Sequence, residues 1–145
     1  MSLVNQVIET LSGESESHCE DISDAARLKM NSVLATLMEA GGDFFGATVS
    51  SIDGIAWAEV LMPGFDKHRF AAMSSSLLAI SDELASEVNS GATNNLLIEA
   101  ASGKIVIMHA GPLMLLTVFT KKDATLGMAL AHAKKATEAL EAIEI

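Results

Sequence analysis

The chain has 145 residues, half of them hydrophobic, and a formal net charge of −10 at pH 7. This length and apolar content suit one compact domain with a single core. A chain this acidic is repelled by phosphate groups, which disfavours binding to nucleic acids and to anionic membrane surfaces. No apolar run approaches the roughly 20 residues of a membrane-spanning helix, and the first residues do not resemble a secretory leader. We therefore expect a cytoplasmic protein without membrane insertion.

The first 21 residues differ from the rest and are interpreted as an N-terminal appendage. Residues 1–12 are expected to form a short helix with apolar side chains at helical spacing: Leu3, Val4, Val7, Ile8 and Leu11. Residues 12–21, SGESESHCED, are polar and acidic and are expected to form a loop. The loop holds the chain's single cysteine, Cys19, so no internal disulfide can form, in agreement with a reducing compartment. The domain itself is predicted to span residues 22–145.

A helix and a hairpin are predicted to begin this domain. Residues 23–40 carry apolar side chains on one helix face: Met30, Val33, Leu34, Leu37 and Met38. Ser23 or Asp24 can cap this helix, and Gly41-Gly42 ends it. Residues 44–52 and 55–60 are predicted strands. Asp53-Gly54 between them is typical of a two-residue type I′ turn, which needs positive φ at both central positions.

A longer helix is predicted from Asp66, its cap, to about Asn89, with Gly91 terminating it. It carries a continuous apolar stripe formed by Phe70, Met73, Leu77, Ile80, Leu84 and Val88. Beside the stripe lies a flank of mainly small residues, namely Ser74, Leu78, Ser81 and Ala85. Because small side chains allow helix axes to approach to about 8–10 Å, this flank indicates a contact with another helix.

Three strands and a last helix complete the predicted domain. The strands, residues 94–100, 104–109 and 113–119, have short connections and are therefore expected to be antiparallel. The middle strand is apolar on both faces, which favours a sheet covered on both sides. Asp123 can cap a final helix that ends near residue 142. Within this helix Gly127 costs about 1 kcal/mol relative to alanine, which a close approach to the sheet would offset, and Thr137 is expected to bond back to a carbonyl one turn earlier.

This order of elements, with these glycines, resembles the Roadblock family, named for a dynein light chain. Bacterial and archaeal members include the co-regulator of the gliding-motility small GTPase. The resemblance covers about residues 22–141 and depends on the order of several short motifs. They are Asp53-Gly54, Gly91 before LIEA (residues 97–100), Gly103, Gly111 before LMLLTVF (residues 113–119), and DATLGMALAHAKKA (residues 123–136).

The resemblance implies an α+β (α/β) fold of the Roadblock/profilin-like kind. The five-stranded antiparallel sheet has the order 2-1-5-4-3, with the second helix on one face and the first and last helices on the other. Family members are typically homodimers or heterodimers, joined edge to edge at the third strand with the second helices side by side. For this chain the expected dimer interface comprises Ser74, Leu78, Ser81 and Ala85 on the helix, and Asn95, Leu97 and Glu99 on the strand.

No catalytic or metal-binding pattern stands out, so we expect neither an enzyme nor a cofactor. His18, Cys19, Glu20 and Asp21 are better explained as surface residues, because no second ligand cluster accompanies them. Residues 74–76 are serines, with His68 and Asp82 near in sequence, but nothing resembles a nucleophile elbow. His109 and His132 are interpreted as hydrogen-bonded or surface histidines, and Gly41-Gly42 lacks the phosphate-loop pattern.

The resemblance further implies that a Ras-like small GTPase docks over the paired second helices. On this chain that partner surface would include Ser75, Asp82 and Ser86, although a solvated helix face explains each residue singly. Arg69 could act as an arginine finger, but family regulators generally position the GTPase's own residues instead.

The leading hypothesis is a non-enzymatic dimeric regulator or scaffold, either GTPase-activating or a co-regulator, that modulates the nucleotide cycle of the GTPase. Two alternatives remain open. A structural light-chain-like subunit differs from the regulator only in its partner. A small-ligand sensing module would need an apolar pocket, which six aromatic residues and no tyrosine make less favourable.

Overall fold

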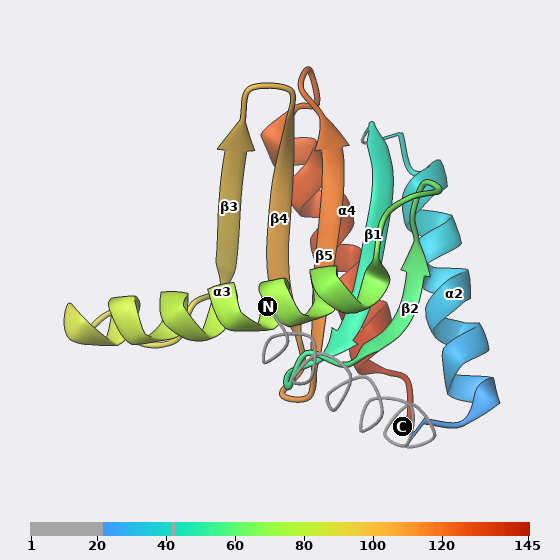
Figure 1. Ribbon diagram of the computed structural model, residues 1–145, viewed down its shortest axis with the longest axis horizontal. Coiled ribbons are helices and arrows are strands. Elements are labelled where there is room, and N and C mark those ends of the chain that lie inside the picture. The colour runs from blue at the N-terminus through green and yellow to red at the C-terminus, as the bar shows by residue number, and fades with distance from the viewer. Residues whose placement is uncertain (1–21, 42) are drawn as a thin grey trace, which may run out of the picture.

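The computed structural model describes residues 22–41 and 43–145 (Figure 1). The expected helix over residues 1–12 and the acidic loop over residues 12–21 lie outside this range. In chain order the elements are α2 (Asp24–Glu39), β1 (Phe44–Ser51), β2 (Ala56–Val60), α3 (Lys67–Glu87), β3 (Asn95–Ala100), β4 (Gly103–Ala110), β5 (Met114–Lys121) and α4 (Leu126–Glu141).

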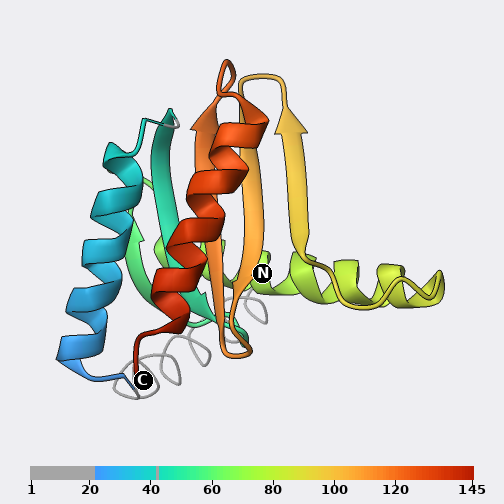
Figure 2. The same cartoon turned by 180° about the vertical axis from the view of Figure 1, so that it is seen from behind.

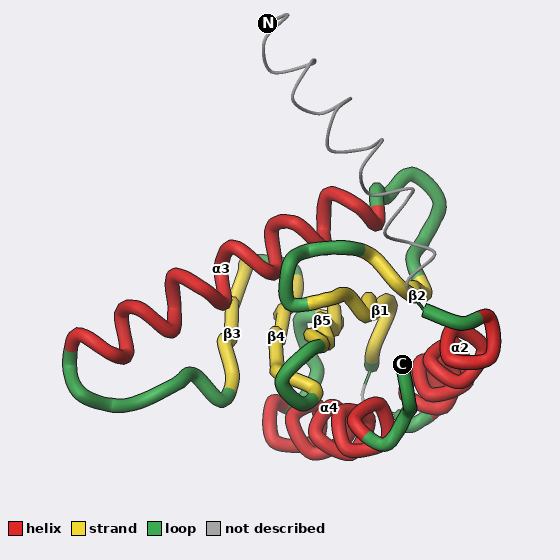
Figure 3. The backbone as a smooth tube through the Cα atoms, turned by 90° about the horizontal axis from the view of Figure 1, so that it is seen from below, coloured by secondary structure: helices red, strands yellow, loops and turns green. Residues whose placement is uncertain are grey.

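The five strands form one antiparallel sheet in the order β2-β1-β5-β4-β3. Helix α3 crosses one face of the sheet, whereas α2 and α4 lie side by side on the other (Figures 1 and 2). Viewed along the strands, the three layers are separate (Figure 3). The sheet order and the distribution of the helices are those expected from the family resemblance.

The main core fills the space between the sheet and the α2/α4 pair. Met30 and Leu34 from α2 and Leu140 from α4 are fully buried there against Val106 and Leu116 of the sheet. A smaller cluster lies under α3, where Leu78 packs against Ile107 and Leu115. Within the described residues, no helix is long and apolar enough to cross a membrane.

The β1–β2 turn differs from the expected one. The backbone N–H of Ser51 donates to the carbonyl of Ile55 at 2.8 Å, and that of Gly54 donates to Ser51 at 3.0 Å. Gly54 has φ of 91°, but Asp53 is not among the residues with positive φ. The connection therefore has three residues and ends in a left-handed glycine, so the two-residue type I′ turn is wrong. The Ser51 hydroxyl stabilises the longer turn by accepting a hydrogen bond from Ile55 N–H at 3.0 Å.

The end of α3 also differs from the prediction. The first left-handed residue after the helix is Asn89, with φ of 57°, two positions before Gly91, which was expected to terminate the helix and has φ of 76°. The N–H of Asn89 donates to the Ser86 carbonyl, and the N–H of Ser90 donates to the Ala85 carbonyl, both within 3.0 Å. This is the Schellman pattern, in which asparagine tolerates the left-handed conformation through its short polar side chain.

Helix α4 corrects two expectations and confirms one. It begins at Leu126 after Thr125, so Asp123 is not its cap. A Cβ at Gly127 would meet nothing within 4 Å, so no close approach to the sheet explains this glycine. The Thr137 hydroxyl does donate to the Lys134 carbonyl at 2.6 Å, as expected for a polar residue on the buried face.

Candidate interaction surfaces

Helix α3 is the longest described helix, with 21 residues, and its C-terminal part continues beyond the edge formed by β3 (Figures 1 and 2). Asp66 fixes its start, since its carboxylate accepts hydrogen bonds from the N–H groups of His68 and Arg69. The part of α3 that projects past β3 has no strand of its own sheet beneath it (Figures 1 and 2).

The exposed side of α3 is strongly apolar. We define the α3 stripe as the residues with the following exposed fractions: Met73 49%, Leu77 38%, Ile80 63%, Leu84 69% and Val88 68%. Contiguous apolar side chains of this size on a soluble domain mark a binding surface more often than an ordinary solvated face. The α3 stripe is the strongest candidate contact on the described chain.

The small flank of α3 faces the chain's own sheet. Ser74 is buried, and its Oγ accepts a hydrogen bond from Thr117 Oγ1 at 2.9 Å. Leu78 is only 2% exposed. This packing leaves Ser74 and Leu78 no surface to offer a second helix. Ser81 and Ala85 are half-buried, and the Ser81 hydroxyl shares a hydrogen bond of 2.9 Å with the Thr93 hydroxyl.

Strand β3 forms one edge of the sheet and pairs only with β4 among the described strands. Asn95, Leu97 and Glu99 are exposed on one face of the strand, and Leu97 has an exposed fraction of 36%. Leu96 on the other face is half-buried beside the smaller core cluster. A free edge of this kind presents unpaired N–H and C=O groups to another strand.

The three residues predicted for the GTPase surface have different environments. The Ser75 hydroxyl donates to the Ile52 carbonyl at 2.6 Å and so ties α3 to the β1–β2 turn. The Asp82 carboxylate accepts a hydrogen bond of 2.8 Å from Thr93 N–H, and its other oxygen lies 3.7 Å from His109 Nε2. Ser86 is exposed. Two of the three side chains therefore have a structural role inside the domain.

The ionisation of Asp82 is perturbed by its surroundings. The hydrogen bond from Thr93 N–H holds the pKa of its carboxyl below the ordinary value of 3.8, and the nearby His109 acts in the same direction. The interaction joins the middle of α3 to the loop that leads into β3. It thereby links the two surfaces described above.

No catalytic arrangement emerges in the described part of the chain. No group of three or more histidine, cysteine, aspartate or glutamate side chains lies close enough there to hold a metal ion. His109 contacts Asp82, whereas His132 packs edge-on against Phe44 with ring centroids 6.4 Å apart. Arg69 is exposed in the first turn of α3. His18, Cys19, Glu20 and Asp21 lie outside the described residues.

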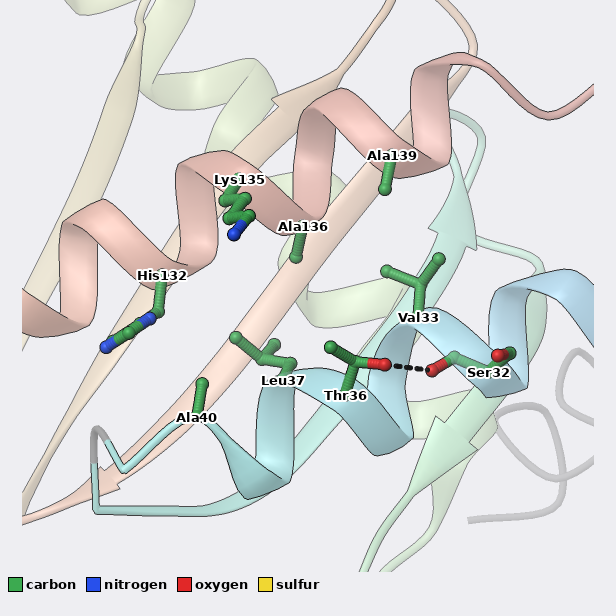
Figure 4. Close-up of a pocket in the computed structure, with 9 residues that line it drawn as sticks. All are labelled: Ser32, Val33, Thr36, Leu37, Ala40, His132, Lys135, Ala136 and Ala139. Carbon is green, nitrogen blue, oxygen red and sulfur yellow. Dashed lines mark hydrogen bonds between the residues drawn. The ribbon is translucent and has the colours of Figure 1, made fainter.

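A groove separates α2 from α4 on the outer side of the molecule (Figure 4). Its volume is about 310 Å³, near the lower end for ligand pockets. We define the α2–α4 groove by its lining residues, which are Ser32, Val33, Thr36, Leu37, Ala40, His132, Lys135, Ala136 and Ala139. Sequence patterns did not predict it, because it arises where alanines of α4 fail to fill the space beside α2.

Comparison with known proteins adds a family and a set of related folds. The family model for the Roadblock/LC7 domain matches residues 30–120. MglB of Myxococcus xanthus superposes with a TM-score of 0.76 at 18% identity, covering 83% of this chain and 90% of that one. The gliding protein mglB of Thermus thermophilus gives 0.74 at 21% identity, covering 84% and 93%.

A Roadblock/LC7 domain from Streptomyces avermitilis gives a TM-score of 0.71 at 15% identity, covering 76% of this chain and 92% of that chain. No curated protein sequence shows significant similarity to this chain. At these identities the solved structures support the fold and its sheet order.

Proposed function

Because the chain belongs to the Roadblock/LC7 domain family, we propose that it is a non-enzymatic dimeric regulator of a Ras-like small GTPase. The observation that carries this proposal is that the exposed α3 stripe lies next to the free edge of β3. The two surfaces adjoin, since α3 projects past β3 (Figure 1). One two-fold assembly of the domain could therefore cover both surfaces.

The proposed dimer joins two β3 strands edge to edge, with the two α3 helices side by side. The helix contact is made by the α3 stripe instead of the small flank, because the flank packs against the chain's own sheet. On the strand, Asn95, Leu97 and Glu99 remain the expected contacts. The overhanging part of α3 then reaches across the two-fold axis toward the second copy.

The energetics favour this assignment. Burying one large apolar side chain contributes about 1.5–3 kcal/mol, whereas association of two proteins costs about 4–15 kcal/mol in lost freedom. Several such side chains must therefore be buried together, as the α3 stripe allows. Backbone hydrogen bonds along β3 would add direction and register to this non-directional contact.

The GTPase is proposed to bind the two-fold surface over the paired helices, where Ser86 is exposed. Ser75 and Asp82 make hydrogen bonds within the domain. We therefore propose that they hold this surface in place and do not contact the GTPase directly. The net charge of −10 favours a partner surface with basic residues. Regulation requires unequal affinity for two conformations of the GTPase, since a ligand with equal affinity for both shifts nothing.

The test compares two leucines that are equally exposed. Leu84 on the α3 stripe and Leu28 on α2 both have 69% of their surface accessible. We expect Leu84→Glu to yield a single chain by sedimentation and to lose GTPase capture from the native cell. Leu28→Glu should retain both. Capture should also differ between GDP and a non-hydrolysable GTP analogue.

Two outcomes would contradict the proposal. One is an unchanged mass for Leu84→Glu at micromolar concentration. The other is a wild-type protein that captures no GTPase and alters neither nucleotide hydrolysis nor exchange. Nucleotide-independent capture of a large assembly would instead support the structural-subunit alternative. The α2–α4 groove keeps the ligand-sensing alternative in consideration, because its volume is at the scale of a small-ligand site.

A further inference from the structure

The α2–α4 groove is an apolar surface on the face of the sheet opposite α3 (Figures 2 and 4). Val33 and Leu37 form one wall, and Ala136 and Ala139 form the other. The Thr36 hydroxyl on the first wall donates to the Ser32 carbonyl at 3.1 Å and so has a partner within α2. The floor and walls are consequently suited to apolar side chains.

Two polar groups at the groove lack partners among the described residues. The Nε2 atom of His132 is buried and neither accepts nor donates a hydrogen bond within that part of the chain. Lys135 forms no ion pair with any residue of the described ranges. A ligand of this groove should therefore be apolar along its length and should carry negative charge near α4.

The chain's own N-terminal residues have this chemistry. In residues 1–11 the apolar residues Leu3, Val7 and Leu11 recur every four positions, with Val4 and Ile8 beside them. Residues at this spacing share one face of a helix. Residues 1–21 also hold five acidic residues and no lysine or arginine; the acidic residues are Glu9, Glu14, Glu16, Glu20 and Asp21.

The connection is long enough to reach the groove. Ile22 lies two residues before Asp24, where α2 begins, and at 1.5 Å per residue Asp24 lies about 12 Å from Ser32 at the near end of the groove. Residues 12–21 can span at most about 33–36 Å when fully extended. The ten-residue connector thus places residues 1–11 alongside α2 without strain.

We propose that residues 1–11 form an amphipathic helix that docks in the α2–α4 groove of its own chain. Its apolar face covers Val33, Leu37 and Ala136, and carboxylates of the N-terminal segment lie near Lys135. Docking within one chain needs no loss of translational freedom, so a short segment suffices where a separate peptide would bind weakly. The α3 stripe lies across the sheet and β3 lies on the other side of α4 from α2 (Figure 2), so both stay free and the docked segment is independent of the proposed dimer.

The experiment places a nitroxide on the polar side of the N-terminal segment of the full chain. In Asn5→Cys/Cys19→Ser the label is attached at position 5, and amide signals are followed by nuclear magnetic resonance. We expect strong paramagnetic broadening at Thr36, His132 and Lys135, and much weaker broadening at Leu84 on the opposite side of the sheet. Adding Val7→Glu, which disrupts only the segment's apolar face, should remove most of the broadening.

A second pair of variants tests the groove. Ala139 and Ala131 are both exposed on α4, but only Ala139 lines the groove. Ala139→Glu should abolish the broadening, because it adds bulk and repels the acidic segment, whereas Ala131→Glu should leave it unchanged. Equal effects of the two substitutions would overturn the proposal.

A mixing control separates the chain's own segment from that of a second copy. Isotope-labelled chains without nitroxide are mixed with nitroxide-bearing chains that carry no isotope. Broadening of the groove signals in this mixture would assign the groove to another copy and overturn docking within one chain. If no sample shows stronger broadening at the groove than elsewhere, the groove has no N-terminal occupant, and this result would also overturn the proposal.

Discussion

The two faces of the sheet are covered to different degrees. On the α2/α4 side, eighteen buried hydrophobic residues form one cluster within the described chain. On the α3 side, the corresponding cluster has three, Leu78, Ile107 and Leu115. One face is therefore covered by the chain itself, whereas on the other face most of the apolar surface of α3 is exposed.

The chemistry of the sheet explains this asymmetry. On the α3 side, Thr48 lies opposite Thr117 and Ser50 lies opposite Leu115 in the ladder. These short, largely polar side chains accommodate small residues of α3, such as Ser74, which bonds to Thr117. The hydroxyls of Thr48 and Ser50 are buried without a partner among the described residues. The small residues of α3 therefore face these strands, and the large residues of the α3 stripe remain exposed.

The largest expected effects come from two separate variants, each of which places a charge on one side of α3. Leu78→Arg would bury an unpaired charge under the helix and should lower the free energy of unfolding by about 3–5 kcal/mol. Ile80→Arg, on the exposed stripe, should change the stability of the isolated chain by less than about 0.5 kcal/mol but prevent dimerisation. Urea unfolding and sedimentation velocity measure the two quantities separately.

Two results would break this contrast between the sides of α3. An unchanged unfolding midpoint for Leu78→Arg would show that α3 is not held by its buried flank. A dimer that persists in Ile80→Arg would remove the stripe from the interface. Equal losses of stability and of dimerisation in both variants would mean that the two sides of α3 are equivalent.

A smaller effect is expected at the edge of the sheet. Leu97→Asp brings two carboxylates near the two-fold axis of the proposed dimer, where like charges on paired strands repel. We expect the dimer dissociation constant to rise about 10- to 100-fold, equivalent to about 1.4–2.8 kcal/mol. Ser102→Asp adds the same charge to the exposed β3–β4 turn and should leave the constant unchanged. Equal constants for both variants would exclude β3 from the contact.

Much of the fold could be predicted from the sequence because its signals are local. Apolar spacing located α2, α3 and α4, and glycines marked most of the strand ends. The sheet order, however, came from the family resemblance, since no local pattern states which strands pair at a distance. The turn after Ser51 was missed because its length depends on a hydrogen bond to the Ser51 side chain.

The candidate site was harder to predict, and α3 shows why. Its stripe and its small flank are both plausible contact faces when the helix is considered alone. Which one meets the sheet depends on Thr48, Ser50 and Thr117, which come from strands that are distant in sequence. Likewise, the exposed surroundings of Gly127 and the groove beside Ala136 depend on the spacing of whole helices.

The smallest expected effect concerns the link between α3 and β3. The pKa of Asp82 is lowered in the folded chain, chiefly by the Thr93 N–H hydrogen bond, so its ionised form stabilises the fold. That contribution is present above the unfolded pKa of about 3.8 and is lost as the pH falls through the lower folded value. Because 36% of the side chain is exposed, solvent screens the interaction and the effect is small.

Asp82→Asn keeps an oxygen for the Thr93 N–H but removes the charge. The variant should therefore unfold at slightly lower urea concentration than the wild type at pH 7, and the difference should vanish near pH 2. Asp123→Asn removes one exposed carboxylate outside this link and should show no difference at either pH. A deficit for Asp82→Asn that persists at pH 2 would mean that the side chain acts through shape and not charge. In that case the junction of α3 and β3 would not depend on ionisation, and acid would leave the proposed dimer surface intact.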